Sequence, residues 1–229
     1  MINRNKNGRY CSMRKKSLWS LLLLLTIAFV LAACNGSSDD GDSNSDNNTD
    51  DGKDTPSTPQ VLVFGRGGDS VSLDPGIVTD GESFKVTQNL FETLLNFGEE
   101  DTTIKPGLAK DWSVSDDGLT YTFKLQEGVK FHDGTDFNAE AVIKNVNRWK
   151  AGNKEQFYYF NSMFKAEGAD VIKDVKADGD YTVIFTLSRP QAPFLKNLAM
   201  SPFGIASPTA FEKDGDKFGQ NPVGTGPFK

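Results

Sequence analysis

Hydrophobic residues recur at every second position in two stretches of the chain, and each stretch predicts a β-hairpin. Single polar residues separate the apolar positions of Leu119–Leu125, which follow a turn at Asp116-Asp117-Gly118. The same period of two recurs in Tyr181–Leu187, after Val171–Ala177 and a turn at Asp178-Gly179-Asp180. Because side chains of a strand point alternately to its two faces, each hairpin should have one buried and one solvated face.

Helical spacing is found in three other stretches. Residues 83–97 place apolar side chains at intervals of four, with Asp80 and Glu82 at the positive end of the expected helix. Asn138 can cap a helix from Ala139 to about Lys150, and Phe194–Met200 predicts a short helix. Strands mixed with helices predict an α/β or α+β domain.

Val61–Phe64 is a continuous apolar run that ends in glycines, which predicts a buried strand. A strand followed by glycines invites a dinucleotide-binding interpretation. Ser70 stands where the third glycine of that fingerprint belongs, and Asp74-Pro75 follows where a helix should begin. We therefore reject a nucleotide site, and we expect residues 201–229 to be rich in loops.

Charge divides the chain into three blocks. Residues 1–34 carry six basic groups and no acid, residues 35–60 carry seven Asp against one Lys, and 61–229 carries 18 basic and 24 acidic groups. The third block is therefore mildly acidic, which argues against nucleic-acid binding, because that function needs a basic face. Its apolar content is sufficient for a folded core.

Cysteine and histidine are scarce. Cys11 and Cys34 both precede the third block, so that block can form no internal disulfide or cysteine-based site. His132 is the single histidine, which excludes a site built from several histidines. We expect no metal and no cofactor, and we interpret His132-Asp133 as a hydrogen-bonded turn pair.

The first 33 residues have the features of a signal peptide, with Met13 as an alternative start. A basic segment precedes sixteen mostly apolar residues, Leu18–Ala33, which are fewer than the roughly 20 that a membrane-spanning helix needs. The segment ends in Leu31-Ala32-Ala33-Cys34, which resembles a bacterial lipobox. That resemblance implies a lipid on Cys34, and we favour a lipoprotein over a plain secreted protein.

Residues 34–60 predict a lipidated cysteine followed by a disordered acidic tether. The segment consists almost wholly of Asp, Ser, Asn, Gly, Thr and Pro, without an apolar anchor. Its start, Asp40-x-Asp42-x-Asn44, is similar to a calcium loop, but Ser45 replaces the required glycine and no closing Glu follows. A long tether suits the surface of a Gram-positive cell, although a periplasmic location stays open.

One continuous pattern in 61–229 resembles the family 5 extracellular solute-binding proteins. These are the lipoproteins that bind oligopeptides, dipeptides or nickel for ABC importers. The pattern consists of Ser72-Leu73-Asp74-Pro75, Leu108-Ala109, Asp111-Trp112, Gly118, Tyr121-Thr122-Phe123, Leu125, Gly128-Val129, Phe131-His132-Asp133-Gly134, Phe137, Ala139, Val142 and Gly224-Thr225-Gly226-Pro227-Phe228.

The resemblance implies the α/β fold of periplasmic-binding-protein-like II receptors, with two lobes that close like a flytrap. It also implies an extra domain at roughly 80–200. The second lobe is missing from the sequence, so we expect a truncated product, the N-terminal part of the family domain, with weakened binding. Most aromatic residues of the pattern should be core, and Gly128 and Gly134 should serve turns.

In this family the loop after Leu-Asp-Pro faces the ligand cleft. The resemblance therefore implies ligand contacts from Thr79, Asp80, Gly81, Glu82 and Ser83. Gly81 would let a ligand approach the backbone, and the hydroxyl and amide groups could pair with a peptide main chain. An ordinary helix-capping loop is the alternative interpretation of the same residues.

The expected function is substrate binding for an ABC importer of peptides, without enzymatic activity. The expected partners are a peptide, the permease and ATPase subunits, and the lipid anchor. Within the family, a nickel chelate, haem, glutathione or an opine are alternative ligands. A hydrolase is the alternative from another class, although no GxSxG elbow is present. A purely adhesive surface lipoprotein is a third possibility.

Overall fold

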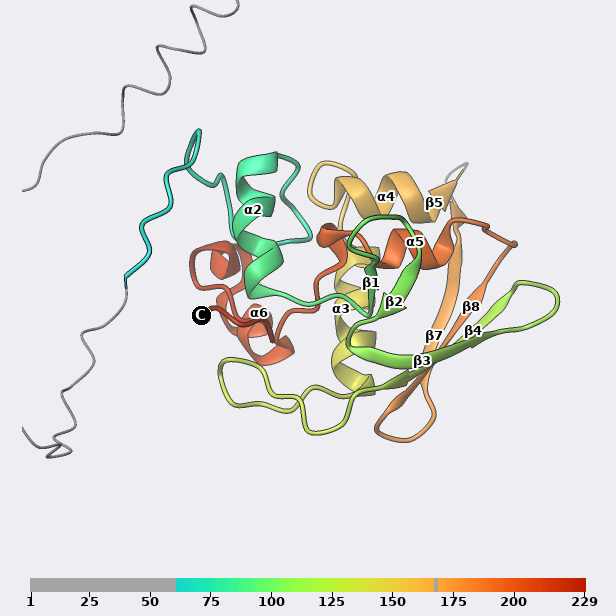
Figure 1. Ribbon diagram of the computed structural model, residues 1–229. Coiled ribbons are helices and arrows are strands. Elements are labelled where there is room, and N and C mark those ends of the chain that lie inside the picture. Colours follow the sequence, from blue (N-terminus) through green and yellow to red (C-terminus); the bar gives the residue numbers. More distant parts are fainter. Residues whose placement is uncertain (1–60, 167–168) are drawn as a thin grey trace, which may run out of the picture. The chain divides into compact units, whose positions relative to one another are not determined.

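A four-stranded antiparallel sheet in the order β3-β4-β8-β7 organises the protein (Figure 1). The computed structural model describes residues 61–166 and 169–229. The signal peptide, the lipidated Cys34 and the acidic tether expected from the sequence lie outside the described residues. The strands of the sheet are β3 (Ala109–Val114), β4 (Thr120–Leu125), β7 (Ile172–Ala177) and β8 (Thr182–Leu187).

Both hairpins predicted from the alternating pattern are confirmed. β3 pairs with β4, and β7 pairs with β8, each in antiparallel register. Their turns place Gly118 at φ 68° and Gly179 at φ 72°, a conformation that glycine adopts without steric cost. The second strands of the two hairpins then pair with each other, with Phe123 opposite Val183. Two local turns and one long-range pairing therefore make the sheet.

α3 (Ala139–Ala151) and α5 (Phe194–Leu198) pack on the buried face of this sheet, and α4 (Tyr158–Phe164) packs on α3 (Figure 1). Phe123 and Phe185 pack edge to face at 5.4 Å on adjacent strands, and Phe194 packs against Phe185 at 5.8 Å. Burial of these rings is the main stabilising term of the sheet.

The predicted helix after Asn138 is confirmed as α3, which runs one residue further than expected. The Asn138 Oδ1 accepts a hydrogen bond from the Ala141 amide at 3.0 Å and so caps the helix. Val142, Val146 and Trp149 are buried on its inner face. α3 packs on β7 and β8, which makes it the central support of the fold.

The predicted helix over 83–97 is wrong in its second half. α2 spans only Gly81–Leu90, and β1 (Leu95–Phe97) then pairs with β2 (Ile104–Pro106). After Leu90 the backbone carbonyls accept hydrogen bonds from distant segments. The Leu108 amide donates to Thr93 at 3.0 Å, and the Ile205 amide donates to Glu92 at 2.8 Å. Tertiary pairing therefore overrides the helical spacing of the apolar residues.

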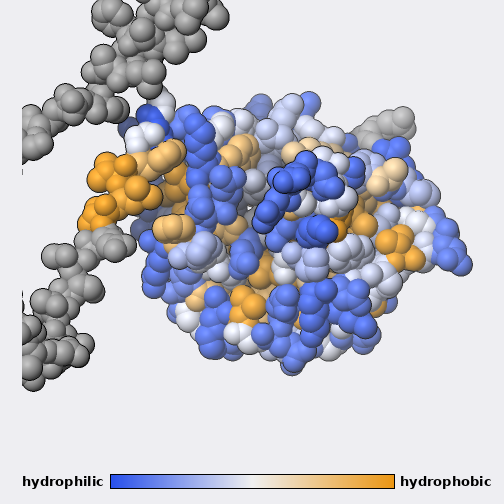
Figure 2. Space-filling view, viewed as in Figure 1, coloured by the Kyte–Doolittle hydropathy of each residue, from blue (hydrophilic) through white to orange (hydrophobic). Residues whose placement is uncertain are grey.

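The buried strand predicted at Val61–Phe64 is also wrong. All four residues are irregular in structure and 73–90% exposed. Figure 2 shows this segment as an orange, hydrophobic patch at the left of the view. Among the described residues no strand pairs with it, and an apolar run without a partner cannot form a sheet.

Residues 201–229 contain more helix than the sequence analysis expected. They form η1 (Ser201–Phe203), α6 (Pro208–Asp214) and η2 (Gly215–Gln220). The Ser207 hydroxyl accepts from the Ala210 amide and caps α6, with Pro208 at the first helical position. Ser-Pro is a helix-start signal that the sequence analysis missed.

A second, smaller core connects α2 to the C-terminal helices. Its buried residues are Leu90, Phe91, Ala206, Ala210, Phe211 and Phe218. The remaining strands, β5 (Lys165–Ala166) and β6 (Ala169–Asp170), form a short pair. In the part of the chain that the structure describes, no helix has the length and apolar character to cross a membrane.

Candidate functional site

The Leu73-Asp74-Pro75 element forms a tight turn directly before the predicted ligand loop. The Asp74 carboxylate accepts from the Gly76 amide at 3.1 Å, and the Asp74 carbonyl accepts from the amides of Ile77 and Val78, each at 3.3 Å. The Asp74 side chain is 3% exposed. This turn therefore fixes the direction in which the chain enters the loop.

Arg148 of α3 neutralises the buried Asp74. Its Nη1 donates to Asp74 Oδ1 at 3.3 Å, and its Nη2 donates to Oδ2. The guanidinium also lies against three aromatic rings, with Cζ at 4.9 Å from the centroid of Phe211, 5.2 Å from Phe218 and 5.4 Å from Phe157. A two-pronged, ring-stacked contact of this kind needs arginine and not lysine. The turn is thereby attached to α3, α6 and η2.

Two of the five predicted ligand residues are engaged within the fold. The Asp80 carboxylate caps α2 by accepting from the Ser83 amide at 2.8 Å. This backbone hydrogen bond lowers the pKa of Asp80. The buried Ser83 hydroxyl accepts from the Val71 amide at 2.9 Å. Asp80 and Ser83 therefore shape the loop, as the helix-capping interpretation proposed.

Of the other three residues, Thr79 and Gly81 are open to solvent, whereas Glu82 is partly buried. A Cβ built at Gly81 would meet no atom within 4 Å. Glu82 Oε1 pairs with Lys85 Nζ at 2.6 Å, whereas Glu82 Oε2 is buried and has no hydrogen-bond partner. The geometry leaves Thr79 and the Gly81 backbone accessible to a ligand, so their predicted role in binding stays a prediction.

An apolar hollow lies next to this loop, and we call it the Phe84 hollow. Its volume is about 330 Å³. It is lined by Phe84, Phe97, Tyr159, Ala199, Met200, Ser201 and Pro202. The sequence analysis missed it because its walls come from α2, β1, α4 and the segment after α5, and no spacing along the chain indicates that these segments meet.

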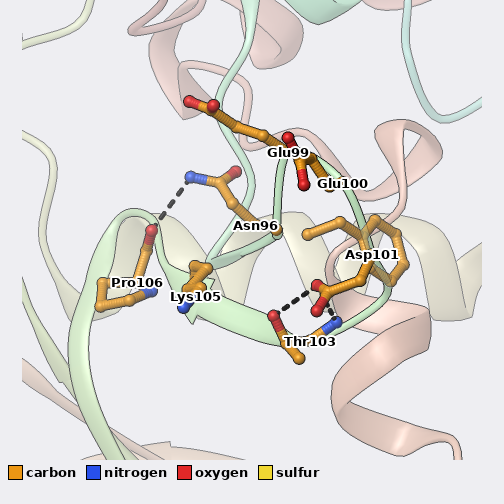
Figure 3. Close-up of a pocket in the computed structure, with 9 residues that line it drawn as sticks. Asn96, Glu99, Glu100, Asp101, Thr103, Lys105 and Pro106 are labelled. Atoms are coloured by element: carbon orange, nitrogen blue, oxygen red, sulfur yellow. Dashed lines mark hydrogen bonds between the residues drawn. The ribbon is translucent and has the colours of Figure 1, made fainter.

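A second hollow, of about 550 Å³, surrounds the loop between β1 and β2 (Figure 3). It carries Glu99, Glu100 and Asp101 beside Lys105. Thr103 donates to Asp101 through its amide and its hydroxyl, and the hydroxyl hydrogen bond lowers the pKa of Asp101. Over residues 61–166 and 169–229 no group of three His, Cys, Asp or Glu is placed to hold a metal ion.

The His132-Asp133 pair is hydrogen-bonded, as predicted. The His132 Nε2 lies 2.7 Å from the Gly226 carbonyl, and the Gly224 amide donates to Nδ1 at 3.4 Å. The His132 amide also donates to the Gly224 carbonyl at 2.9 Å. The imidazole thus attaches the Gly224-Thr225-Gly226 segment to the loop after β4, and the predicted turn glycines nearby, Gly128 and Gly134, have positive φ.

Asp133 contributes a pH dependence that can be predicted. Burial acts to raise its pKa, but hydrogen bonds from Ser207 and Thr135 outweigh burial and lower it. A carboxylate with a lowered pKa stabilises the fold above its unfolded pKa of about 3.9, and this contribution is lost as the pH falls further. In urea titrations we expect the stability advantage of the wild type over Asp133→Asn to shrink below about pH 4.

Ser207→Ala is the matched variant for this prediction, because it removes the donor and keeps the carboxylate. In Ser207→Ala the free energy of unfolding should therefore fall less steeply below about pH 4 than in the wild type. A difference between wild type and Asp133→Asn that is equal at pH 6 and pH 3 would contradict the assignment.

Residues 103–229 match the family described as "Bacterial extracellular solute-binding proteins, family 5 Middle". The chain belongs to this family. The glutathione-binding protein GsiB of Shigella flexneri is 38% identical over 170 residues, which are 73% of this chain and 31% of that protein. A dipeptide-binding protein of Escherichia coli K12 is 36% identical over 189 residues, 74% of this chain and 35% of that protein.

Solved structures of bacterial binding proteins have a similar fold over part of their length. The periplasmic binding protein DppA of Helicobacter pylori, in complex with the peptide STSA, has a TM-score of 0.62 at 37% identity. This likeness covers 70% of this chain and 34% of DppA. The α/β fold class expected from the sequence is confirmed. The chain spans about a third of the length of the relatives that it matches.

Proposed function

We propose that this chain forms part of the substrate-binding protein of an ABC importer that takes up peptides. Its likeness to a dipeptide-binding protein and to DppA in complex with STSA carries the proposal. Such a protein binds its ligand and releases it unchanged, so no enzymatic activity is expected. The permease and ATPase subunits would be its partners and would supply the energy for transport.

The loop Thr79–Ser83 is the proposed contact with the peptide. Asp80 and Ser83 fix its shape through their hydrogen bonds, which reduces the entropy that binding would otherwise cost. The exposed Gly81 backbone and the Thr79 hydroxyl can then pair with the peptide main chain, since binding sites combine a preformed surface with a few placed polar groups. Recognition of main-chain groups would accept many peptide sequences.

The proposed place of action is the outer face of the cell membrane, in line with the extracellular character of the family. Cys34 would carry the lipid, and residues 35–60 would hold the domain away from the membrane. This arrangement suits a Gram-positive surface best. The proposed domain division, with an extra domain at roughly 80–200, follows the resemblance to the family.

Glutathione is the second candidate ligand, because GsiB is described as a glutathione-binding protein. Other relatives are described with Ni(L-His) or with agropinic acid as ligands. The described residues offer no cluster that would hold a bare metal ion, so nickel would have to arrive as a chelate. A peptide remains the proposed ligand.

The proposal predicts that short peptides bind to the full 229-residue chain and perturb the amide NMR signals of the Thr79–Ser83 loop. Gly81→Leu should weaken this binding about tenfold, because the new side chain occupies the approach to the backbone. Gly81 is exposed and a Cβ built there meets no atom within 4 Å, so the variant should remain folded. Titrations with glutathione and with nickel–histidine would compare the binding of these alternative ligands with that of peptides.

Thr209→Ala, at an exposed position of α6, is the control and should leave binding unchanged. The proposal fails if no peptide perturbs the loop at millimolar concentration. It also fails if Gly81→Leu and Thr209→Ala bind peptides equally well.

A further inference from the structure

The Phe84 hollow is built almost wholly from apolar side chains. Six of its seven lining residues are apolar, Ser201 is the exception, and none is charged. Phe84 directly follows Ser83 in the sequence, so one wall of the hollow continues from the proposed peptide loop. Concave apolar surfaces with few polar groups are where small ligands bury most of their area.

The walls of the hollow are held by the surrounding fold. Phe84 of α2 and Tyr159 of α4 pack edge to face, with ring centroids 5.9 Å apart. The Met200 amide donates to the Asn197 carbonyl at 3.1 Å, and the Met200 carbonyl accepts from the Phe203 amide at 2.9 Å. The backbone at Met200 is therefore fixed, while its flexible side chain can adapt to an occupant.

We propose that the Phe84 hollow receives one apolar side chain, aromatic or branched aliphatic, of the bound peptide. This inference rests on the proposed function and adds a side-chain preference to it. The volume of about 330 Å³ lies at the low end of the range for ligand pockets, about 300–1,000 Å³, so the hollow suits one side chain and not a whole peptide.

The charges around the hollow favour the same occupant. A smaller hollow that shares Ala199 and Ser201 with it carries Glu92. The hollow of Figure 3 shares Phe97 with it and carries three carboxylates against one ammonium group. An acidic side chain would therefore meet repulsion from the carboxylates of these neighbouring hollows as well as an apolar interior. Peptides with an apolar residue and no acidic neighbour should bind best.

The test compares the binding of four tripeptides to the full 229-residue chain by NMR titration: Ala-Phe-Ala, Ala-Leu-Ala, Ala-Gly-Ala and Ala-Asp-Ala. We expect the first two to bind about tenfold more tightly than Ala-Gly-Ala, because they bury an apolar side chain. Ala-Asp-Ala should bind most weakly. The amide signals of Phe84 and Phe97 should shift with the two apolar peptides.

Two adjacent tyrosines provide a matched pair of variants. Tyr159 lines the hollow, whereas Tyr158 is 46% exposed and lies outside it. Tyr159→Ala should abolish the preference for Ala-Phe-Ala over Ala-Gly-Ala, and Tyr158→Ala should retain it. Met200→Asp, which places a charge in the hollow without removing a ring, should also abolish the preference.

The outcomes separate this inference from the proposed function. If all four tripeptides bind equally at the Thr79–Ser83 loop, or if Tyr159→Ala keeps the preference, the inference is overturned and peptide binding stands. If no tripeptide binds, both are overturned. A preference that is lost in Tyr159→Ala and Met200→Asp, and kept in Tyr158→Ala, supports the inference.

Discussion

Replacing Arg148 by leucine should lower the free energy of unfolding by about 4 kcal/mol. The substitution leaves the Asp74 carboxylate, which is 3% exposed, without its positive partner. Breaking a buried ion pair on one side costs about 3–5 kcal/mol, because an uncompensated charge stays in the interior. The contact of the guanidinium with the rings of Phe157, Phe211 and Phe218 is lost as well. Urea denaturation of the full chain measures this change.

Lys144 on the same helix provides the control. It forms an exposed ion pair with Glu212 at 2.8 Å, and surface pairs of this kind add little to stability because water screens them. Lys144→Ala should therefore lower the free energy of unfolding far less than Arg148→Leu does. Arg148→Lys should fall between the two variants, because lysine keeps the charge but cannot bridge both oxygens. Equal losses for Arg148→Leu and Lys144→Ala would show that the buried pair is not a major support.

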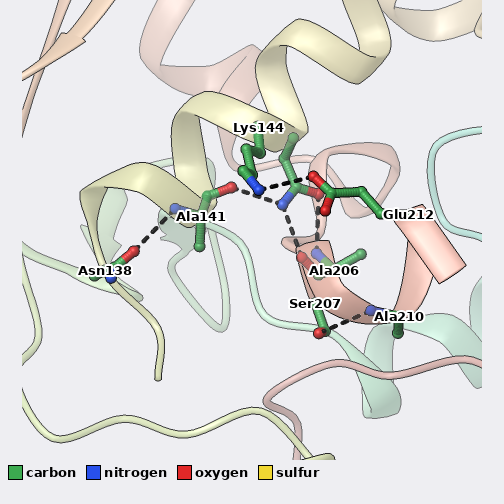
Figure 4. Close-up of polar contacts among 8 residues, drawn as sticks. Asn138, Ala141, Lys144, Ala206, Ser207, Ala210 and Glu212 are labelled. Atoms are coloured by element: carbon green, nitrogen blue, oxygen red, sulfur yellow. Dashed lines mark hydrogen bonds and ion pairs between the residues drawn. The ribbon is translucent and has the colours of Figure 1, made fainter. Parts of the chain in front are cut away.

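Asn145→Ala should lower the free energy of unfolding by about 3 kcal/mol. The fully buried Asn145 side chain connects α3 to the segment before α6. Figure 4 shows Ala141 of α3 close to Ala206 of that segment. Its Nδ2 donates to the carbonyls of Ala141 at 2.9 Å and Ala206 at 2.8 Å, and its Oδ1 accepts from the Ala206 amide at 3.0 Å. Truncation leaves both peptide groups of Ala206 buried without partners, at about 1–3 kcal/mol each.

Asn147, two residues further along the same helix, is exposed and provides the matched substitution. Asn147→Ala should change the free energy of unfolding by no more than about 0.5 kcal/mol. Thermal and urea denaturation should rank the two variants in the same order. A loss below 1 kcal/mol for Asn145→Ala would mean that water or a rearranged backbone satisfies the Ala206 peptide groups.

The sequence predicted those elements whose signals are local. The period of two in Leu119–Leu125 and Tyr181–Leu187, with a glycine in each turn, is enough to define a hairpin whatever its surroundings. The start of α3 is likewise encoded by Asn138 and the helical spacing after it. Such signals act within a few residues, so they can be read without knowledge of the tertiary structure.

Long-range contacts decided the elements that were predicted wrongly. Leu94 and Leu95 fit a continued helix by spacing, yet hydrogen bonds to Leu108, Ala109 and Ile205 hold that stretch extended. Val61–Phe64 has the composition of a strand, but a strand exists only with a partner. Long-range pairing of this kind cannot be predicted from the neighbouring residues in the sequence.

The candidate site likewise contains residues that the sequence suggested and residues that it could not. Resemblance to the family suggested the Thr79–Ser83 loop, whose ligand contacts stay a prediction, and the capping role of Asp80 agrees with its position before a helix. The Phe84 hollow could not be predicted, because its residues come from four segments far apart along the chain. Arg148 gave no sequence signal either, since its partner Asp74 lies 74 positions away.

The attachment of the C-terminal segment to His132 supplies a built-in spectroscopic reporter. Because the protein has one histidine, its imidazole gives a single set of ring signals. The hydrogen-bond network assigns the proton to Nε2, which donates to the Gly226 carbonyl, and leaves Nδ1 to accept from Gly224. The two ring nitrogens should therefore have widely separated ¹⁵N frequencies, and release of Gly224–Gly226 would reduce this separation.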